Sequence, residues 1–383
     1  MLLYKLLKYG MSLTMACFFI VSTNAQMAEK PAPRKTIRNF MNPDSLVLIN
    51  LKIVPVPIFT STPETGVRVG GALEYFFNSK EKKSEARGSY VHGQITYSTL
   101  KQLDISSSWQ IFGRGERYVF RGSAGYANYN EKLWGIGNNT VAENEYNKQF
   151  YNRIYIESKV YKLLKNHQYA GVSFNFSNTY NVRYEKPLNI VDSVITGVNG
   201  SEVFGVGPAF LYDGRDYPFS AHQGAYAEFY YQYYPKIANV GFAFSEWGVD
   251  LRKYFPITTK STFALQFMTK NTIGNVPLRE IPRLGSSNIM RGFFTGRYRD
   301  LSYTAAQAEI RVPVWRFIYG AVFGSAGMVN ESISKYQLNE LRYAGGAGLR
   351  FLVNKKNRMI LRVDYARNSL AGSAFYIRLQ EAF

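Results

Sequence analysis

Two carboxylates near the middle of the chain are the strongest candidates for catalysis. Asp213 and Asp216 stand three residues apart, and a pair of this kind can act as general acid and general base. They fall in a tight turn, however, where aspartates more often accept hydrogen bonds from backbone N–H groups. Arg215 lies between them as a charge partner. We therefore predict that this group shapes a turn and does not catalyse a reaction.

Histidine and cysteine are too few to build a metal site or a nucleophilic triad. The three histidines, His92, His167 and His222, are scattered over one predicted strand and two predicted turns. The single cysteine, Cys17, lies in the N-terminal segment. The glycine-rich string 135–137 lacks the following helix that a phosphate-binding loop needs. The sequence therefore predicts no enzyme, no cofactor and no metal.

The N-terminal segment predicts export. Two lysines precede an apolar run over 11–22, which is too short to span a bilayer. The small residues 23–25 then resemble a cleavage site, so residues 1–25 are predicted to be a signal peptide. Residues 26–44 are polar and contain three prolines, which predicts a short periplasmic lead. Cys17 would leave with the signal peptide.

The composition excludes several classes of protein. With 16% aromatic residues, including 30 Tyr and 27 Phe, the chain is too apolar to be disordered. A mean hydropathy of -0.22 and the lack of a second long apolar run exclude a bundle of transmembrane helices. The formal net charge of +19 would allow nucleic-acid binding, but export makes that partner unsuitable. An anionic lipid surface fits the charge instead.

What recurs along the chain is alternation of apolar and polar residues. Residues 172–177, for example, read Val-Ser-Phe-Asn-Phe-Ser. The alternating segments span roughly 9–12 residues, whereas strands of soluble sandwiches usually have about 5–6. That length fits a tilted strand that crosses a membrane with its apolar face toward lipid. We therefore predict an all-β fold for residues 45–383, a transmembrane β-barrel.

Sixteen segments fit this pattern, and an even number allows an antiparallel barrel to close. The predicted spans are 51–60, 66–77, 87–97, 101–112, 116–128, 150–163, 168–181, 202–212, 224–234, 244–255, 259–271, 302–313, 316–327, 342–352, 358–366 and 373–383. Short turns on one side and long connections at 129–149, 182–201 and 272–301 on the other predict the asymmetry of outer-membrane barrels.

The last segment carries a pattern typical of the final strand of such barrels. Phe375, Ile377, Leu379 and Phe383 are spaced to share one face, which resembles the signal that outer-membrane barrels present for assembly. Glu381 departs from the apolar residue that is usual in that row.

The connection at 272–301 carries the most specific string. Its Arg291-Gly292-Phe293 resembles the sixth-loop signature of the BamA/TamA superfamily, the bacterial surface antigen type of outer-membrane assembly and translocation barrels. The resemblance implies that loop 6 folds into the lumen and that acidic residues on the inner wall hold the arginine. Glu309 matches one such acid, and Ser325 stands where the second belongs. The lock is therefore expected to rest on Glu309 alone.

Other strings support the same resemblance, which covers most of 45–383. Asp213, Arg215 and Asp216, followed by Gly224, resemble the family's turn between the eighth and ninth strands. The small residues 345–348 predict a strand on which a loop packs closely. Only about 25 residues lie between the predicted cleavage site and the first strand, so no POTRA domain, the periplasmic module of the family, is expected.

The resemblance implies a part in outer-membrane protein assembly or translocation, with partner subunits and a labile seam between the first and last strands. Pro55 and Pro57 in the first segment cannot donate to a ladder, which independently predicts weak pairing there. The expected partners are outer-membrane lipid, lipopolysaccharide and other outer-membrane or periplasmic assembly proteins.

Two alternatives from other classes remain open. One is a passive, anion-leaning pore or structural barrel, because lumen arginines could attract anions instead of pairing with acids. These arginines are Arg153, Arg252, Arg311, Arg350 and Arg362, and the acids are Glu228, Glu246, Asp250, Glu309 and Asp364. The other is an outer-membrane lipase, for which no suitably spaced nucleophile, histidine and acid are visible.

Overall fold

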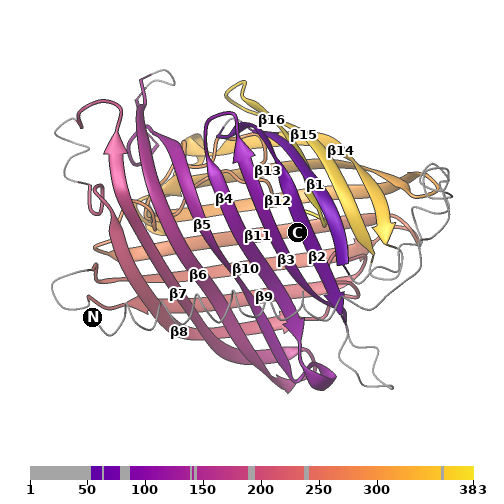
Figure 1. Ribbon diagram of the computed structural model, residues 1–383. Coiled ribbons are helices and arrows are strands. Elements are labelled where there is room, and N and C mark those ends of the chain that lie inside the picture. The colour runs from indigo at the N-terminus through magenta and orange to yellow at the C-terminus, as the bar shows by residue number, and fades with distance from the viewer. Residues whose placement is uncertain are drawn as a thin grey trace, which may run out of the picture. The chain divides into compact units, whose positions relative to one another are not determined.

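Sixteen antiparallel strands close into one barrel in the computed structural model (Figure 1). Each strand pairs with the next along the chain, and β1 meets β16. The structure describes residues 53–62, 64–77, 87–138, 140–141, 145–188, 195–236, 241–354 and 358–383. The predicted signal peptide and polar lead lie outside these residues. Among the described residues, no helix is both long and apolar enough to pass through a bilayer.

The strands are β1 (Ile53–Thr62), β2 (Gly66–Phe77), β3 (Ser89–Ser98), β4 (Leu103–Phe112), β5 (Tyr118–Leu133), β6 (Asn147–Lys165), β7 (Gln168–Tyr184), β8 (Ser201–Asp213), β9 (Gly224–Tyr234), β10 (Phe244–Pro256), β11 (Thr262–Gly274), β12 (Ser302–Trp315), β13 (Ile318–Asn330), β14 (Arg342–Asn354), β15 (Met359–Asn368) and β16 (Ser373–Leu379). The prediction of sixteen antiparallel strands in a closed barrel is confirmed, and two predicted spans, 66–77 and 224–234, have the bounds of β2 and β9.

Alternation along each strand separates the two faces of the wall. In β8, Phe204 and Phe210 are exposed on the outside, while Ala209 and Leu211, the two neighbours of Phe210, are buried. The same outward row of exposed apolar side chains runs around the barrel, through Ile95, Val172, Phe229, Phe267, Val322 and Tyr365. Exposed apolar surface that continues around a whole wall marks a surface covered by lipid.

The longest strands extend beyond the predicted spans. β5, β6 and β7 have 16, 19 and 17 residues, whereas the prediction ended β5 at residue 128. The predicted strands had the length needed to cross a membrane. The observed strands continue to pair beyond that length, where side chains on neighbouring strands stack. The rings of Tyr129 and Tyr151, for example, stack at 6.3 Å. Glu131 lies in this extension and turns out to be an anchor of the site.

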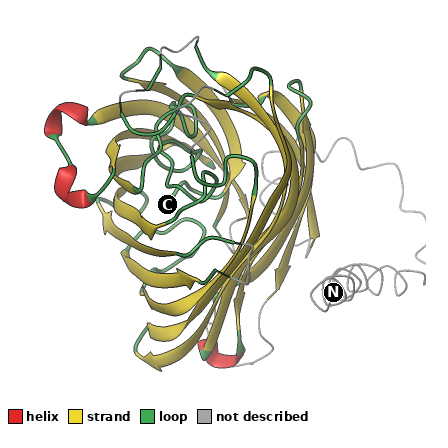
Figure 2. Cartoon of the chain, turned by 90° about the vertical axis from the view of Figure 1, so that its left-hand side faces the viewer, coloured by secondary structure: helices red, strands yellow, loops and turns green. Residues whose placement is uncertain are grey.

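The inside of the barrel is filled with side chains and loop segments. Figure 2 shows loops within the ring of strands. Charged residues on the inner face are buried by these loops, so the interior is a packed, ionic core. Its contacts are concentrated on the connection between β11 and β12, residues 275–301, here called the inner segment.

Candidate functional site

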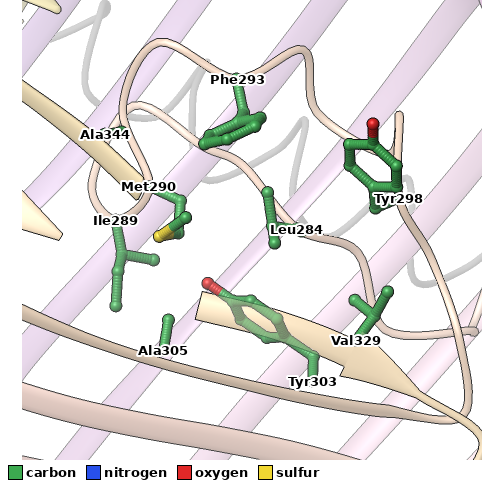
Figure 3. Close-up of a cluster of buried hydrophobic side chains, with 9 residues drawn as sticks. All are labelled: Leu284, Ile289, Met290, Phe293, Tyr298, Tyr303, Ala305, Val329 and Ala344. Carbon is green, nitrogen blue, oxygen red and sulfur yellow. The ribbon is translucent and has the colours of Figure 1, made fainter. Parts of the chain in front are cut away.

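The inner segment carries its own small hydrophobic core. Leu284, Met290 and Phe293 are almost fully buried and pack together with Ile289 and Tyr298 (Figure 3). The wall side of this cluster is formed by Tyr303 and Ala305 of β12, Val329 of β13 and Ala344 of β14. Burial of apolar side chains is the main stabilising contribution to such a contact. The cluster therefore fixes the segment against three neighbouring strands.

This packing places Arg291 between two carboxylates on non-adjacent strands. Its Nη2 lies 2.8 Å from Glu309 Oε2 on β12, and its Nη1 lies 2.7 Å from Asp364 Oδ2 on β15. The guanidinium also lies 3.3 Å from the ring centre of Phe323 on β13. Arg291 is 1% exposed. A planar guanidinium is suited to this bridge because its two ends donate in fixed directions.

The expectation that Glu309 would be the one acidic partner is wrong. Asp364 provides the second carboxylate from β15, two strands beyond the position that Ser325 occupies on β13. Ser325 instead donates to the carbonyl of Ala344 at 3.3 Å. The alternation pattern predicts that Asp364 faces the lumen, but it does not show that the side chain of Arg291 reaches from β12 to β15.

The pair belongs to a larger buried ion centre. Arg350 on β14 contacts Glu309 at 3.0 Å, Glu381 at 3.0 Å and also Asp364. Gly348 makes room for this, since a Cβ there would lie 2.1 Å from Asp364 Oδ1. We define the ion centre as Arg291, Arg311, Arg350, Arg362, Glu309, Asp364 and Glu381. Four guanidiniums thus face three carboxylates, and breaking such a network by removing one member is costly.

All five lumen arginines that the sequence singled out pair with acids. The pairs are Arg153 with Glu280, Arg252 with Asp250, Arg311 with Glu309, Arg350 with Glu309 and Arg362 with Asp364. The two remaining acids are also occupied, Glu228 by Lys159 and Glu246 by Lys270.

Gly292 ties the inner segment to the last two strands. Its N–H donates to Tyr376 Oη on β16 at 3.0 Å, and its carbonyl accepts from Asn368 Nδ2 on β15 at 2.6 Å. The residue has φ of 99°, which only glycine adopts without strain. A Cβ would meet the backbone carbon of Arg367 at 3.1 Å.

We expect Gly292→Ala to destabilise the protein by about 1–3 kcal/mol, because the new Cβ adds both backbone strain and a tight contact. The measurement is the unfolding midpoint in denaturant. Gly324→Ala is the matched control, since nothing lies within 4 Å of a Cβ there and its φ is ordinary. Equal effects of both substitutions would contradict a special conformation at Gly292.

A second anchor holds the opposite side of the inner segment. Glu131 on β5 lies 2.6 Å from Arg299 and 3.7 Å from Arg283, and it also pairs with Arg279. Burial lowers the pKa of Arg299, Glu131 opposes that effect, and the like charges of Arg279 and Arg283 reinforce it. Three guanidiniums therefore share one carboxylate. This anchor was missed because the prediction ended the fifth strand before Glu131.

The C-terminal signal does not keep its four residues on one face. Phe375, Ile377 and Leu379 lie on β16, but the strand ends at Leu379 and Gln380 has φ of 72°. The chain then turns inward, where Phe383 stacks with Tyr254 at 6.4 Å and is buried (Figure 2).

Glu381, the residue that breaks the apolar row, explains this turn. Its carboxylate reaches Arg350 Nε at 3.0 Å and Arg311 Nε at 3.7 Å. A charged side chain at this position would be costly in lipid, and the ion centre provides its partners inside.

The turn between β8 and β9 is structural. Asp213 pairs with Arg215 at 2.8 Å and with Arg87 at 2.9 Å. Asp216 accepts from the backbone N–H groups of Tyr217 and His222, each at 2.9 Å. Gly224 has φ of 109°, and a Cβ there would lie 2.2 Å from the Gly214 carbonyl oxygen. Both carboxylates are thus occupied by structural contacts, which does not suit an acid–base pair. Among the described residues, no group of three or more His, Cys, Asp or Glu side chains could hold a metal ion.

The junction of β1 and β16 is the weakest in the wall. The two strands share one registered pair, Ser61 with Phe375, whereas β1 and β2 share ten and β15 and β16 share seven. Pro55 and Pro57 lie in the part of β1 without a partner on β16 and have no N–H to donate. The inner segment is attached beside this junction through Tyr376.

Comparison with known proteins identifies the family to which this fold belongs. A model described as the Omp85 superfamily domain matches residues 62–368. The chain resembles BamA from Haemophilus ducreyi lacking POTRA domains 1-3, with 11% identity, TM-score 0.53 and coverage of 86% of this chain and 69% of that one. It also resembles CdiB from Acinetobacter baumannii, with 12% identity, TM-score 0.53 and coverage of 85% of this chain and 60% of that one. A third similar structure is CdiB from Escherichia coli, with 10% identity, TM-score 0.55 and coverage of 87% of this chain and 62% of that one.

These structural likenesses show a shared fold, and the chain spans 60–69% of the length of the three solved chains. No curated protein matches it in sequence. The family model covers most of the barrel, so the predicted BamA/TamA-type resemblance is confirmed. The chain belongs to the Omp85 superfamily.

Proposed function

We propose that the protein lies in the outer membrane and takes part in the assembly or translocation of other outer-membrane components. The observation that carries this proposal is the β1–β16 junction, which has a single registered pair, whereas every other pair of neighbouring strands shares at least six. A strand from a client can add to an unpaired edge through backbone hydrogen bonds. The outward band of exposed apolar residues supports the membrane location.

In this proposal the inner segment is a lumen plug that supports the edge strand. Arg291 holds it to β12 and β15, and Gly292 holds it to β15 and β16. Residues 1–25 would direct export as a signal peptide, and 26–44 would form a short periplasmic lead. Lipid and lipopolysaccharide would surround the barrel, and assembly proteins of the outer membrane or periplasm would be its partners.

Depletion of the protein in its own host tests the proposal. We expect several heat-modifiable barrels to decrease in the outer-membrane fraction, because their insertion would lack this edge. Purification in mild detergent should recover client barrels or companion subunits with the wild-type chain. Unchanged barrel levels after depletion would contradict an assembly role.

A passive pore receives no support from the lumen arginines. Those that the sequence offered as an anion path are paired with carboxylates, and the ion centre is buried. Planar-bilayer recording distinguishes the two functions, since large steady currents would favour the pore.

A further inference from the structure

The turn between β8 and β9, residues 214–223 and here called the floor turn, reaches across one end of the barrel. β8 and β9 lie halfway around the ring of strands from the β1–β16 junction. Because successive strands alternate in direction, the floor turn leaves the wall at the end of the barrel where β1 begins. Its Phe219 is 4% exposed and packs among residues from both sides of that junction. The floor turn therefore spans the lumen.

On the β1 side of the junction, Phe219 makes two edge-to-face aromatic contacts. Its ring centre lies 5.9 Å from that of Phe76 on β2, with 89° between the ring planes. The ring centre of Tyr90 on β3 lies 5.1 Å away, with 70° between the planes. Val54 of β1 belongs to the same buried cluster, and Val56 packs against it. Edge-to-face pairs stabilise a contact beyond the apolar area that they bury.

On the other side of the junction, the same residue is attached to the end of the chain. Met359 of β15 is a buried member of the cluster, and Leu379 of β16 packs against it. The backbone carbonyl of Phe219 accepts from the N–H of Glu381 at 3.2 Å, just beyond β16. One side chain from the opposite wall thus contacts both edges of the junction.

Two arginines hold the floor turn in this position. Arg311 of the ion centre donates from Nη1 to the carbonyl of Ala221 at 3.4 Å. Arg358, just before β15, lies 3.6 Å from Asp216, and its guanidinium lies 4.3 Å from the ring centre of Tyr217. The floor turn is therefore fixed along its length, and Phe219 is held where it lies.

We propose that Phe219 is a wedge that keeps the unpaired part of the β1–β16 junction closed from the lumen, and that this part opens when the floor turn withdraws. The one registered pair, Ser61 with Phe375, lies near the other end of β1. Toward the start of β1, Pro55 and Pro57 have no N–H to donate, so side-chain packing takes the place of a ladder. The inference deepens the proposed function, because it names what an entering strand must displace.

A distance between spin labels on the two walls that flank the junction tests the wedge. The labels are attached at Leu73→Cys on β2 and Val363→Cys on β15 of the full-length protein in lipid nanodiscs. Leu73 is exposed on the outer face, and Val363 pairs with Ile377 of β16, so neither label touches the Phe219 cluster. Pulsed electron–electron double resonance measures the distance. Room for one added strand requires a gap wider by about 5 Å, the spacing of neighbouring strands.

Phe219→Ala should therefore add a population whose label distance is longer by up to about 5 Å. Phe219→Leu keeps an apolar side chain but loses both edge-to-face contacts, so the longer distance should appear in a smaller fraction of molecules. Phe244→Ala is the matched control. Phe244 is a buried aromatic residue on β10 that stacks with Tyr234 at 4.0 Å, away from the junction, and its loss should leave the distance unchanged.

Heat-modifiable migration on gels confirms that each variant is folded. An unchanged distance in folded Phe219→Ala would overturn the wedge, and so would an equal lengthening in Phe244→Ala. If Phe219→Ala fails to fold, Phe219→Leu decides the question by the same measurement. The distances are measured without a client, so their outcome is separate from that of the depletion experiment. A longer distance together with unchanged barrel levels after depletion would support the wedge and exclude the assembly role.

Discussion

A disulfide between Ser61→Cys on β1 and Phe375→Cys on β16 will stop the proposed assembly activity and leave the barrel folded. These residues form the one registered pair of the junction, and directly opposite residues have Cβ atoms about 4.5–5.5 Å apart. The bond would fix the edge that a client strand must reach. We expect client insertion to fall to the level of the depleted strain, with recovery on reduction. The measurement is rescue of the depletion phenotype, with and without reductant.

A disulfide on a fully paired junction is the control for that experiment. Val363→Cys and Ile377→Cys join β15 to β16 across another registered pair, within a ladder of seven. This bond restrains strands that are already held together, so it should leave activity unchanged. The native Cys17 lies in the predicted signal peptide and would not interfere. Normal activity of the β1–β16 crosslinked form would exclude opening of the seam as the mechanism.

The barrel itself could be predicted from the sequence because its physical cause is local. Alternation with period two, as in residues 172–177, reports directly which side chains face lipid. The ends of the strands were harder to predict from the sequence, because pairing beyond the membrane depends on the neighbouring strands. Glu131 shows the consequence, because it was assigned to a loop and is an anchor on β5.

The site was only partly predictable, for a related reason. Arg291 and Glu309 could be found because a resemblance points to both. Asp364 and Glu381 required the three-dimensional path of the inner segment and of the chain end. Local alternation placed Phe383 toward lipid, yet the carboxylate of Glu381 has its partners inside and draws the end of the chain inward. Long-range ionic contacts of this kind leave no periodic signal.

Arg291→Ala will cost about 3–5 kcal/mol of stability and increase ion conduction through the barrel. Removing the guanidinium leaves Glu309 and Asp364 buried with one partner fewer, and breaking a buried pair on one side carries a cost of that size. The substitution also removes the ion pairs that link the inner segment to β12 and β15, so the segment should leave its position more often. Denaturant unfolding and planar-bilayer recordings measure the two effects.

Two further variants separate the bridge from the charge. Arg291→Lys keeps the positive charge but cannot donate to both carboxylates at once, so its stability should fall between wild type and Arg291→Ala. Arg252→Ala removes a lumen ion pair whose side chains are 18% and 15% exposed, and solvent screening should limit its effect to about 1 kcal/mol or less. If Arg291→Ala cost no more than Arg252→Ala, the ion centre would not hold the inner segment. Because Gly292 and the hydrophobic cluster remain in Arg291→Ala, brief and erratic openings are expected in place of a permanently open pore.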